Sequence, residues 1–237
     1  ALLGGVEVKS GPPHTMLNLT SPPKLVIFDC DGVVVDSEPL TLNLLCEDLA
    51  SHGLSLSLPE VIDLAVGGTI GGIGVQAKAM GAAILDDWAD KFYEKMFAVL
   101  GQSVELIPGI EVVLDALDHQ GIPFAIGSNG SHRKMGITLG RCGVAERFAG
   151  RAFSPEDVAN PKPAPDVYLL AASKIEIAPG DCVVIEDSAT GARAGVAAGM
   201  VVMGFTHDTP APKFAGITDM LFDDMPVLPA LFGLNAQ

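Results

Sequence analysis

The chain has 237 residues, of which 49% are apolar, and its 14 basic against 29 acidic side chains give a net charge of −15. That length suits one large domain or a core domain with a smaller companion, and the acidity argues against nucleic acid or an anionic membrane surface as the main partner. The longest charge-free apolar stretches, 64–77 and 194–207, are interrupted by glycines and fall short of the ~18–20 residues of a membrane helix, so we expect no membrane span.

Residues 1–23 differ from the rest of the chain, because they hold Gly-Gly, Gly-Pro-Pro and Pro-Pro steps and no apolar period. No basic stretch precedes an apolar one there, so we expect a flexible leader rather than a signal peptide. The four cysteines stand singly in apolar segments, without the spacing of a disulfide framework or a zinc site. Such thiols suit a reducing compartment, and we expect a cytoplasmic protein.

From residue 24 onward, short apolar runs that favour strands alternate with stretches of helical spacing. We expect strands at Leu25–Phe28, Pro123–Gly127, Arg151–Phe153, Cys182–Ile185 and Met200–Gly204. We expect helices at Ser37–His52, Ile110–Gln120, Ser131–Cys142, Ala164–Lys174 and Ala189–Ala198, with more helical material between Pro59 and Leu100. Fully apolar strands separated by helices predict a parallel sheet covered on both faces. The predicted fold is therefore α/β, with a Rossmann-like parallel sheet as its core.

A purely helical block interrupts this alternation. We assign residues 24–37 and 106–237 to the α/β core and residues 38–105 to an inserted α-helical domain. Trp88, Phe92 and Met96 recur at helical spacing, which favours packing inside that insert. The glycines at 67–74 follow no strand and do not fit a dinucleotide fingerprint, so we expect a loop between helices.

Polar side chains follow three of the expected strands. They are Asp29 and Asp31, Ser128 and Asn129, and Glu186 and Asp187. Ligands of open parallel sheets bind beyond the carboxyl ends of the strands, so we expect these groups to converge. Four carboxylates in one place need a cation, and oxygen ligands without histidine or cysteine favour Mg²⁺. Lys162, in a proline-rich loop, would add a positive charge suited to a phosphate-bearing substrate.

The same residues carry a family resemblance. The segment LVIFDCDGVVVDSEPL resembles the first motif of the haloacid dehalogenase-like hydrolases. Ser128 in IGSNGS, Lys162 in NPKPAPDVY and Glu186-Asp187 in VVIEDSATGARAGVAAGM resemble the other three motifs, in the same order. The likeness spans about residues 24–206, and the helical insert resembles the small cap of the subgroup that holds beta-phosphoglucomutase and sugar-phosphate phosphatases.

The resemblance implies a role for each motif residue. Asp29 would be the nucleophile that forms an aspartyl-phosphate, and Asp31 would exchange protons with the leaving alcohol and the attacking water. Donation needs a protonated Asp31, so we expect its pKa to rise when the cap closes. Ser128, Asn129 and Lys162 would bind the phosphoryl group. The magnesium ligands would be Asp29, the backbone carbonyl of Asp31, Asp187 and Glu186, the last directly or through water. Gly32 would permit the turn that brings Asp31 inward, and the 67–74 segment would be a cap loop close to the substrate.

The predicted function is a Mg²⁺-dependent phosphatase for a small phosphorylated metabolite, such as a sugar phosphate, in a monomer or weak homodimer. A phosphomutase is the first alternative, although the segment after Ser128 and the arginine-free 67–74 segment lack the second phosphate clamp of the related mutase. A dehalogenase would lack Asp31 and have no use for a metal. A non-catalytic binding protein would have lost at least one motif residue, and all are present.

Four other basic residues lie close to these motifs in the sequence. His132 follows the Ser128 loop, where it is a candidate for substrate contact, although a surface position is the stronger expectation. Arg133, Lys134 and Arg193 are expected to be solvated charges on helices.

Overall fold

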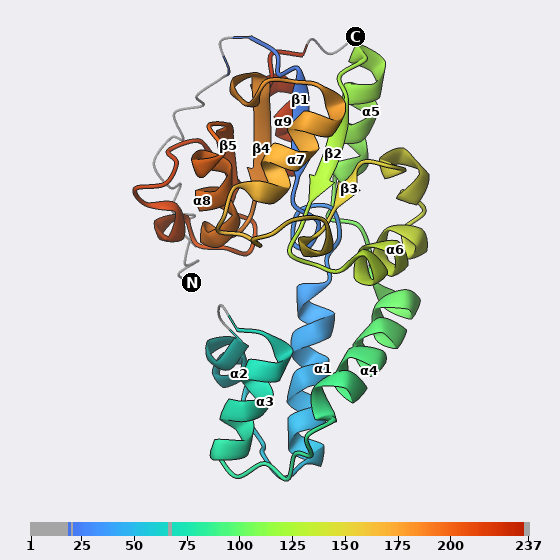
Figure 1. The fold of residues 1–237 in the computed structure, drawn as a ribbon, viewed down its shortest axis with the longest axis vertical. Helices are drawn as coiled ribbons and strands as arrows, with labels where there is room; N and C mark the ends of the chain where they lie inside the picture. Colours follow the sequence, from blue (N-terminus) through green and yellow to red (C-terminus); the bar gives the residue numbers. More distant parts are fainter. Residues whose placement is uncertain (1–18, 20, 66–67, 235–237) are drawn as a thin grey trace, which may run out of the picture.

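The computed structural model describes residues 19, 21–65 and 68–234, and it contains a six-stranded parallel sheet between two layers of helices (Figure 1). The strands are β1 (Leu25–Phe28), β2 (Phe124–Gly127), β3 (Ala152–Phe153), β4 (Cys182–Glu186), β5 (Val201–Phe205) and β6 (Leu221–Phe222). Their order across the sheet is β3-β2-β1-β4-β5-β6, and all neighbours are parallel. The predicted α/β fold is therefore confirmed, and β1 lies between the two other strands that end in motif residues.

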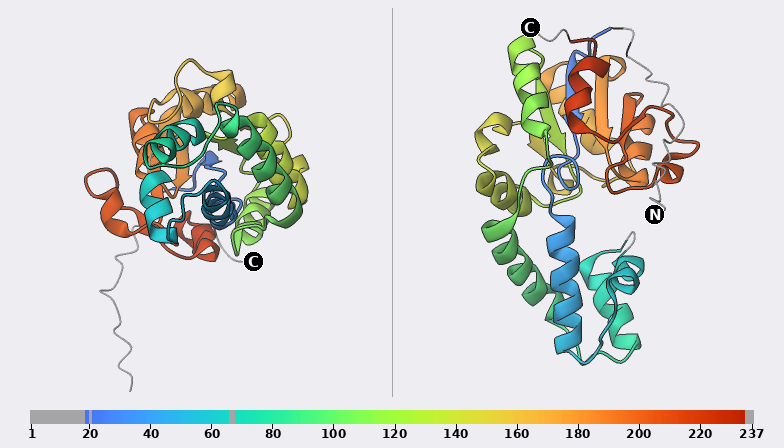
Figure 2. Two further views of the ribbon diagram at one scale, coloured as in Figure 1. Left: turned by 90° about the horizontal axis from the view of Figure 1, so that it is seen from below. Right: turned by 180° about the vertical axis from the view of Figure 1, so that it is seen from behind.

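Alternate residues of each strand face different helices. The helices around the sheet are α5 (Ile110–Gln120), α6 (His132–Arg141), α7 (Asp166–Ile175), α8 (Ala189–Ala197) and α9 (Leu228–Leu231). Leu25 and Ile27 of β1 pack into the apolar cluster that contains α7 and α8, whereas Val26 and Phe28 pack into the cluster that contains α5, α6 and α9. Figure 2 shows α5 and α9 on the face opposite to α7 and α8. Because both faces are covered, every residue of β1 is apolar and buried.

Four further helices, the cap helices, lie beyond the carboxyl ends of the strands (Figure 1). They are α1 (Glu38–Ser51), α2 (Leu58–Ala65), α3 (Ile70–Ala79) and α4 (Trp88–Ser103). The chain enters and leaves this group side by side, because Val35 pairs with Leu106 and the Asp36 amide donates to the Glu105 carbonyl at 2.9 Å. The cap helices fall inside the expected insert of residues 38–105, and the division into two domains stays a prediction.

The first turn of α6 holds α4 against the core. The Arg133 guanidinium forms a two-pronged ion pair with Glu94 of α4, with 2.8 Å between Nη2 and Oε2, and lies 4.4 Å from the centre of the Phe97 ring. Arg133 is an exposed charge on a helix, as predicted, and its ion pair with Glu94 was not expected. Arg193 is exposed, as expected.

Several local predictions need correction. The segment 67–74 is not one loop, because Thr69 caps a helix that begins at Ile70, and its Oγ accepts a hydrogen bond from the Gly72 amide. Gly74 of that helix packs on the Trp88 ring, which is buried as predicted. Strand β6, helix α9 and the short 3-10 helices 145–148, 155–157, 179–181, 211–214 and 225–227 were not expected. The predicted leader lies almost wholly outside the described residues.

Among the residues that the structure describes, no single helix is long and apolar enough to cross a membrane. Helices α2 and α3 have the required length and apolarity only when they are counted together, and the chain bends by 120° between them.

Candidate active site

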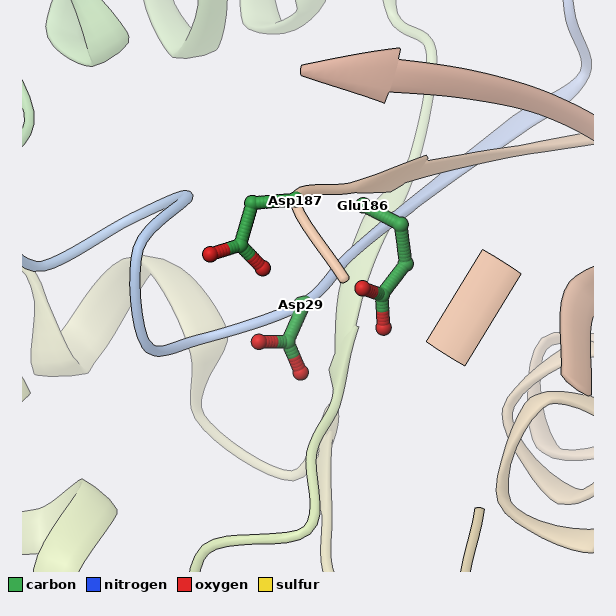
Figure 3. A group of neighbouring side chains, drawn as sticks. All are labelled: Asp29, Glu186 and Asp187. Atoms are coloured by element: carbon green, nitrogen blue, oxygen red, sulfur yellow. The ribbon is translucent and has the colours of Figure 1, made fainter. Parts of the chain in front are cut away.

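Three neighbouring strands deliver the predicted polar residues to one edge of the sheet. Asp29 follows β1, Ser128 follows β2, and Glu186 ends β4. The carboxylates of Asp29, Glu186 and Asp187 point toward one another (Figure 3), and one oxygen of each lies within 4.8 Å of the others. Three of the four carboxylates that were expected to converge therefore lie together, and Asp31 is not in this group.

Lys162 reaches this cluster from the loop before α7. Its buried ammonium lies 2.6 Å from Oδ1 of Asp29 and 2.6 Å from Oε1 of Glu186. Burial alone would lower the pKa of Lys162, but the two carboxylates raise it above its ordinary value. Lys162 is thus a fixed positive charge beside Asp29.

Glu186 is fully buried, and both of its oxygens already accept hydrogen bonds. Oε1 accepts from Lys162 and from the Tyr168 hydroxyl at 2.7 Å, and Oε2 accepts from the amide and the hydroxyl of Ser188 at 3.0 and 2.9 Å. Gly191 makes room for this carboxylate, because a Cβ atom there would lie 1.6 Å from Oε1. A metal bound directly to Glu186 would have to displace one of these hydrogen bonds.

Asp29 and Asp187 carry negative charge that the protein compensates only in part. Burial raises the pKa of Asp29 from 3.8 to about 7, against the effect of Lys162 and with that of Glu186 and Asp31. Burial and the charges of Glu186 and Asp29 also raise the pKa of Asp187. Among the described residues, none donates a hydrogen bond to the Asp187 carboxylate. Lys162 is the one cation paired with Asp29 among the described residues, and none pairs with Asp187, so these two neighbouring carboxylates fit a hard divalent cation.

Asp31 lies outside this group of three carboxylates and pairs with a second lysine. Lys134, in the first turn of α6, places its Nζ 2.8 Å from Oδ1 of Asp31, and the Ser37 hydroxyl donates to the same oxygen. Burial acts to raise the pKa of Asp31, but Lys134 and Ser37 outweigh it and lower that pKa below its ordinary value. The rise expected for a closed cap is therefore not present in this conformation. The prediction that Lys134 is a solvated charge is wrong.

The side chains of Ser128 and Asn129 differ in the hydrogen bonds that they already make. The buried Ser128 hydroxyl accepts a hydrogen bond from the Gly130 amide at 2.9 Å, which leaves its proton available to a ligand. The Asn129 carboxamide instead bonds the backbone of Lys162, accepting from its amide at 3.0 Å and donating to its carbonyl at 3.3 Å. These two bonds join Asn129 to the Lys162 backbone, and contact of Asn129 with substrate stays a prediction.

The surroundings of Gly32 and His132 bear on two further expectations. Gly32 has a φ of +77°, and a Cβ atom there would lie 2.1 Å from Oδ2 of Asp187, so the turn needs glycine as predicted. His132 is half-exposed, with its Nε2 2.8 Å from Oδ2 of Asp157, so its ring already has a protein partner.

Comparisons with known proteins agree with this geometry. The family model described as haloacid dehalogenase-like hydrolase matches residues 23–199. The 6-phosphogluconate phosphatase of Escherichia coli is 30% identical over 185 residues, which are 77% of this chain and 82% of that protein. Hexitol phosphatase A of the same organism is 32% identical over 189 residues, 79% of this chain and 85% of that protein.

A solved structure extends the likeness to the fold. The crystal structure of a HAD family hydrolase from Deinococcus radiodurans, with bound phosphate and sodium, superposes with a TM-score of 0.77 at 33% identity, covering 90% of this chain and 98% of that one. The chain therefore belongs to the haloacid dehalogenase-like hydrolase family, and the curated relatives named here are phosphatases.

Proposed function

We propose that this protein is a Mg²⁺-dependent phosphatase that cleaves a small phosphorylated metabolite through an aspartyl-phosphate on Asp29. The observation that carries the proposal is the position of Asp29 between the Lys162 ammonium and the uncompensated Asp187 carboxylate. A carboxylate between a fixed cation and a cation-binding position can accept a phosphoryl dianion, which bare carboxylates would repel.

The residues present fit a magnesium ion. Asp29 and Asp187 would supply carboxylate oxygens, and Asp31 would supply its backbone carbonyl. We assign Glu186 to hold Lys162, because both of its oxygens already accept protein hydrogen bonds. When bound, the ion would neutralise charge between the carboxylates and the incoming phosphate.

Side chains of the protein carry out the remaining steps of the reaction. An Asp29 oxygen attacks phosphorus, and the Ser128 hydroxyl and Lys162 ammonium hold the phosphoryl oxygens as charge develops. Asp31 gives a proton to the leaving oxygen as its bond to phosphorus breaks. The same carboxylate then takes a proton from the water that cleaves the aspartyl-phosphate.

The substrate class rests on the relatives. Proteins named for a sugar-acid phosphate and for hexitol phosphates resemble this chain over more than three quarters of its length. We propose a sugar phosphate or a similar phosphomonoester as substrate. We also propose a cytoplasmic location, since the single cysteines suit a reducing compartment.

The test is phosphate release from p-nitrophenyl phosphate and a panel of sugar phosphates, with Mg²⁺ or with EDTA. We expect turnover that EDTA removes and Mg²⁺ restores, and none in Asp29→Asn, because an amide does not attack phosphorus. Asp219→Asn is the matched control, since Asp219 is exposed and precedes β6, the edge strand that β5 separates from β4. Turnover by Asp29→Asn at more than a few per cent of wild type would exclude the covalent route.

A further inference from the structure

The two oxygens of Asp31 have different surroundings. Oδ1 accepts hydrogen bonds from Lys134 at 2.8 Å and from the Ser37 hydroxyl. Oδ2 accepts none from the part of the chain that the structure describes. A Cβ atom built on Gly130 would lie 3.3 Å from this Oδ2 and 3.3 Å from the Ser128 hydroxyl oxygen. Oδ2 therefore faces the Ser128 loop, where the phosphoryl group is proposed to bind.

The surrounding structure holds the Lys134 side chain in this position. Its side chain is 18% exposed and that of Asp31 is 21% exposed, so the pair is mostly shielded from water. Its backbone amide donates to the Ser131 hydroxyl at 3.2 Å, which caps α6 and fixes the first turn. The aliphatic stem runs past Gly130, where an added Cβ atom would lie 3.6 Å from Cδ. Gly130 is therefore the neighbour of both the Lys134 stem and Oδ2 of Asp31.

We propose that Lys134 is a positioning residue for proton transfer, which fixes Oδ1 of Asp31 and so turns Oδ2 toward the leaving group. The inference rests on the proposed phosphatase function. An ammonium group only donates hydrogen bonds, so a proton carried by Asp31 lies on Oδ2 while Lys134 occupies Oδ1.

The step balances on these atoms. As Asp29 bonds to phosphorus, the ester oxygen keeps the electron pair of its breaking bond and takes the proton from Oδ2, so the alcohol leaves neutral. Asp31 becomes a carboxylate that Lys134 and Ser37 still hold through Oδ1. In the second step, the oxygen of a water bonds to phosphorus and gives a proton to Oδ2. The bond between Asp29 and phosphorus breaks, its electron pair returns to the Asp29 carboxylate, and inorganic phosphate leaves, which restores the starting state.

The proposal predicts that loss of Lys134 acts through Asp31 and depends on the leaving group. Misplacing a catalytic group by about 1 Å costs on the order of 10²-fold in rate. Lys134→Met, which keeps the aliphatic stem, should lower kcat/KM by ~10- to 100-fold for the sugar phosphate that wild type cleaves fastest in the panel. The loss should be several-fold smaller for p-nitrophenyl phosphate, because p-nitrophenolate leaves without a proton.

The experiment is a double-mutant cycle of Lys134→Met and Asp31→Asn, measured with both esters at saturating Mg²⁺. We expect Lys134→Met to change kcat/KM less than about twofold in the Asp31→Asn background, because interacting residues are not additive. Lys134→Arg should recover part of the activity, and Lys174→Met, an exposed lysine on α7, should be unchanged. Circular dichroism checks folding, and Lys134→Gln replaces Lys134→Met if the latter is unfolded.

Equal losses in both backgrounds or for both esters, or a gain on the sugar phosphate, would overturn the role of Lys134 and leave the phosphatase assignment intact. A wild-type protein that hydrolyses neither ester would overturn both proposals.

Discussion

A single added methyl group at Gly191 tests the packing of the site. Gly191 lies in the first turn of α8, and a Cβ atom there would meet Oε1 of Glu186 at 1.6 Å and its carboxyl carbon at 2.1 Å. At that separation, the α8 backbone and the Glu186 carboxylate cannot both stay in place. The carboxylate is buried and accepts four hydrogen bonds. Gly191→Ala must therefore displace Glu186 from some of its partners.

The expected cost follows from those hydrogen bonds. A hydrogen bond to a charged group contributes about 1.5–3 kcal/mol, so losing two costs roughly 3–6 kcal/mol. Replacing glycine by alanine inside a helix returns about 1 kcal/mol. The net loss is on the order of 3 kcal/mol, which lowers the Tm of a domain of this size by about 6–12 °C.

The matched control is Gly136→Ala on α6, where an added Cβ atom meets nothing within 4 Å. There the helix preference acts alone, so we expect a gain of up to about 1 kcal/mol. Calorimetric unfolding of wild type and the two variants measures the loss of stability expected for Gly191→Ala and the gain expected for Gly136→Ala. Gly191→Ala should also lose phosphatase activity, since Lys162 loses a partner. A Gly191→Ala protein as stable as Gly136→Ala would refute the packing described here.

Two other predictions concern charge. In EDTA, the Tm should fall as pH rises from about 4 to about 7, because the folded state holds the Asp29 proton up to its pKa of about 7 while the unfolded state releases it near 3.8. Mg²⁺ should reduce this fall, and a Tm that rises over that range in EDTA would contradict the pKa direction. In the cap helices, Asp48→Ala should cost on the order of 3 kcal/mol by calorimetry, because it leaves the Trp88 indole and the Lys95 ammonium without the buried carboxylate that accepts from both. An unchanged Tm would show that Asp48 contributes little to packing.

The sequence predicts the sheet edge well because the signals there are local. A buried strand must be apolar to its last residue, so the change to Asp29, Ser128 or Glu186 marks the strand end directly. Parallel topology then brings those ends together without any knowledge of side-chain packing. The same logic predicts α5 over its whole range, since glycines flank it on both sides.

The residues that sequence reasoning missed depend on which elements meet in space. Lys134 is separated from Asp31 by more than a hundred residues, and they meet only because the first turn of α6 lies close to the loop after β1. One signal was present, since a lysine in the first turn of a helix that follows the Ser128 loop lies close to the site. The Asn129 contact with the Lys162 backbone requires two loops to touch, which no local pattern encodes. The two-residue strand β6 is too short to show a period.

The central claim is that Asp29 becomes phosphorylated, and the most direct measurement is to trap that adduct. Asp31→Asn should slow the water step, so acid quenching during turnover of p-nitrophenyl phosphate with Mg²⁺ should accumulate phosphoprotein. Peptide mass spectrometry should then place the phosphate on Asp29, with none in the Asp29→Asn variant. Turnover with no adduct on Asp29, or with the phosphate on another residue, would contradict the account.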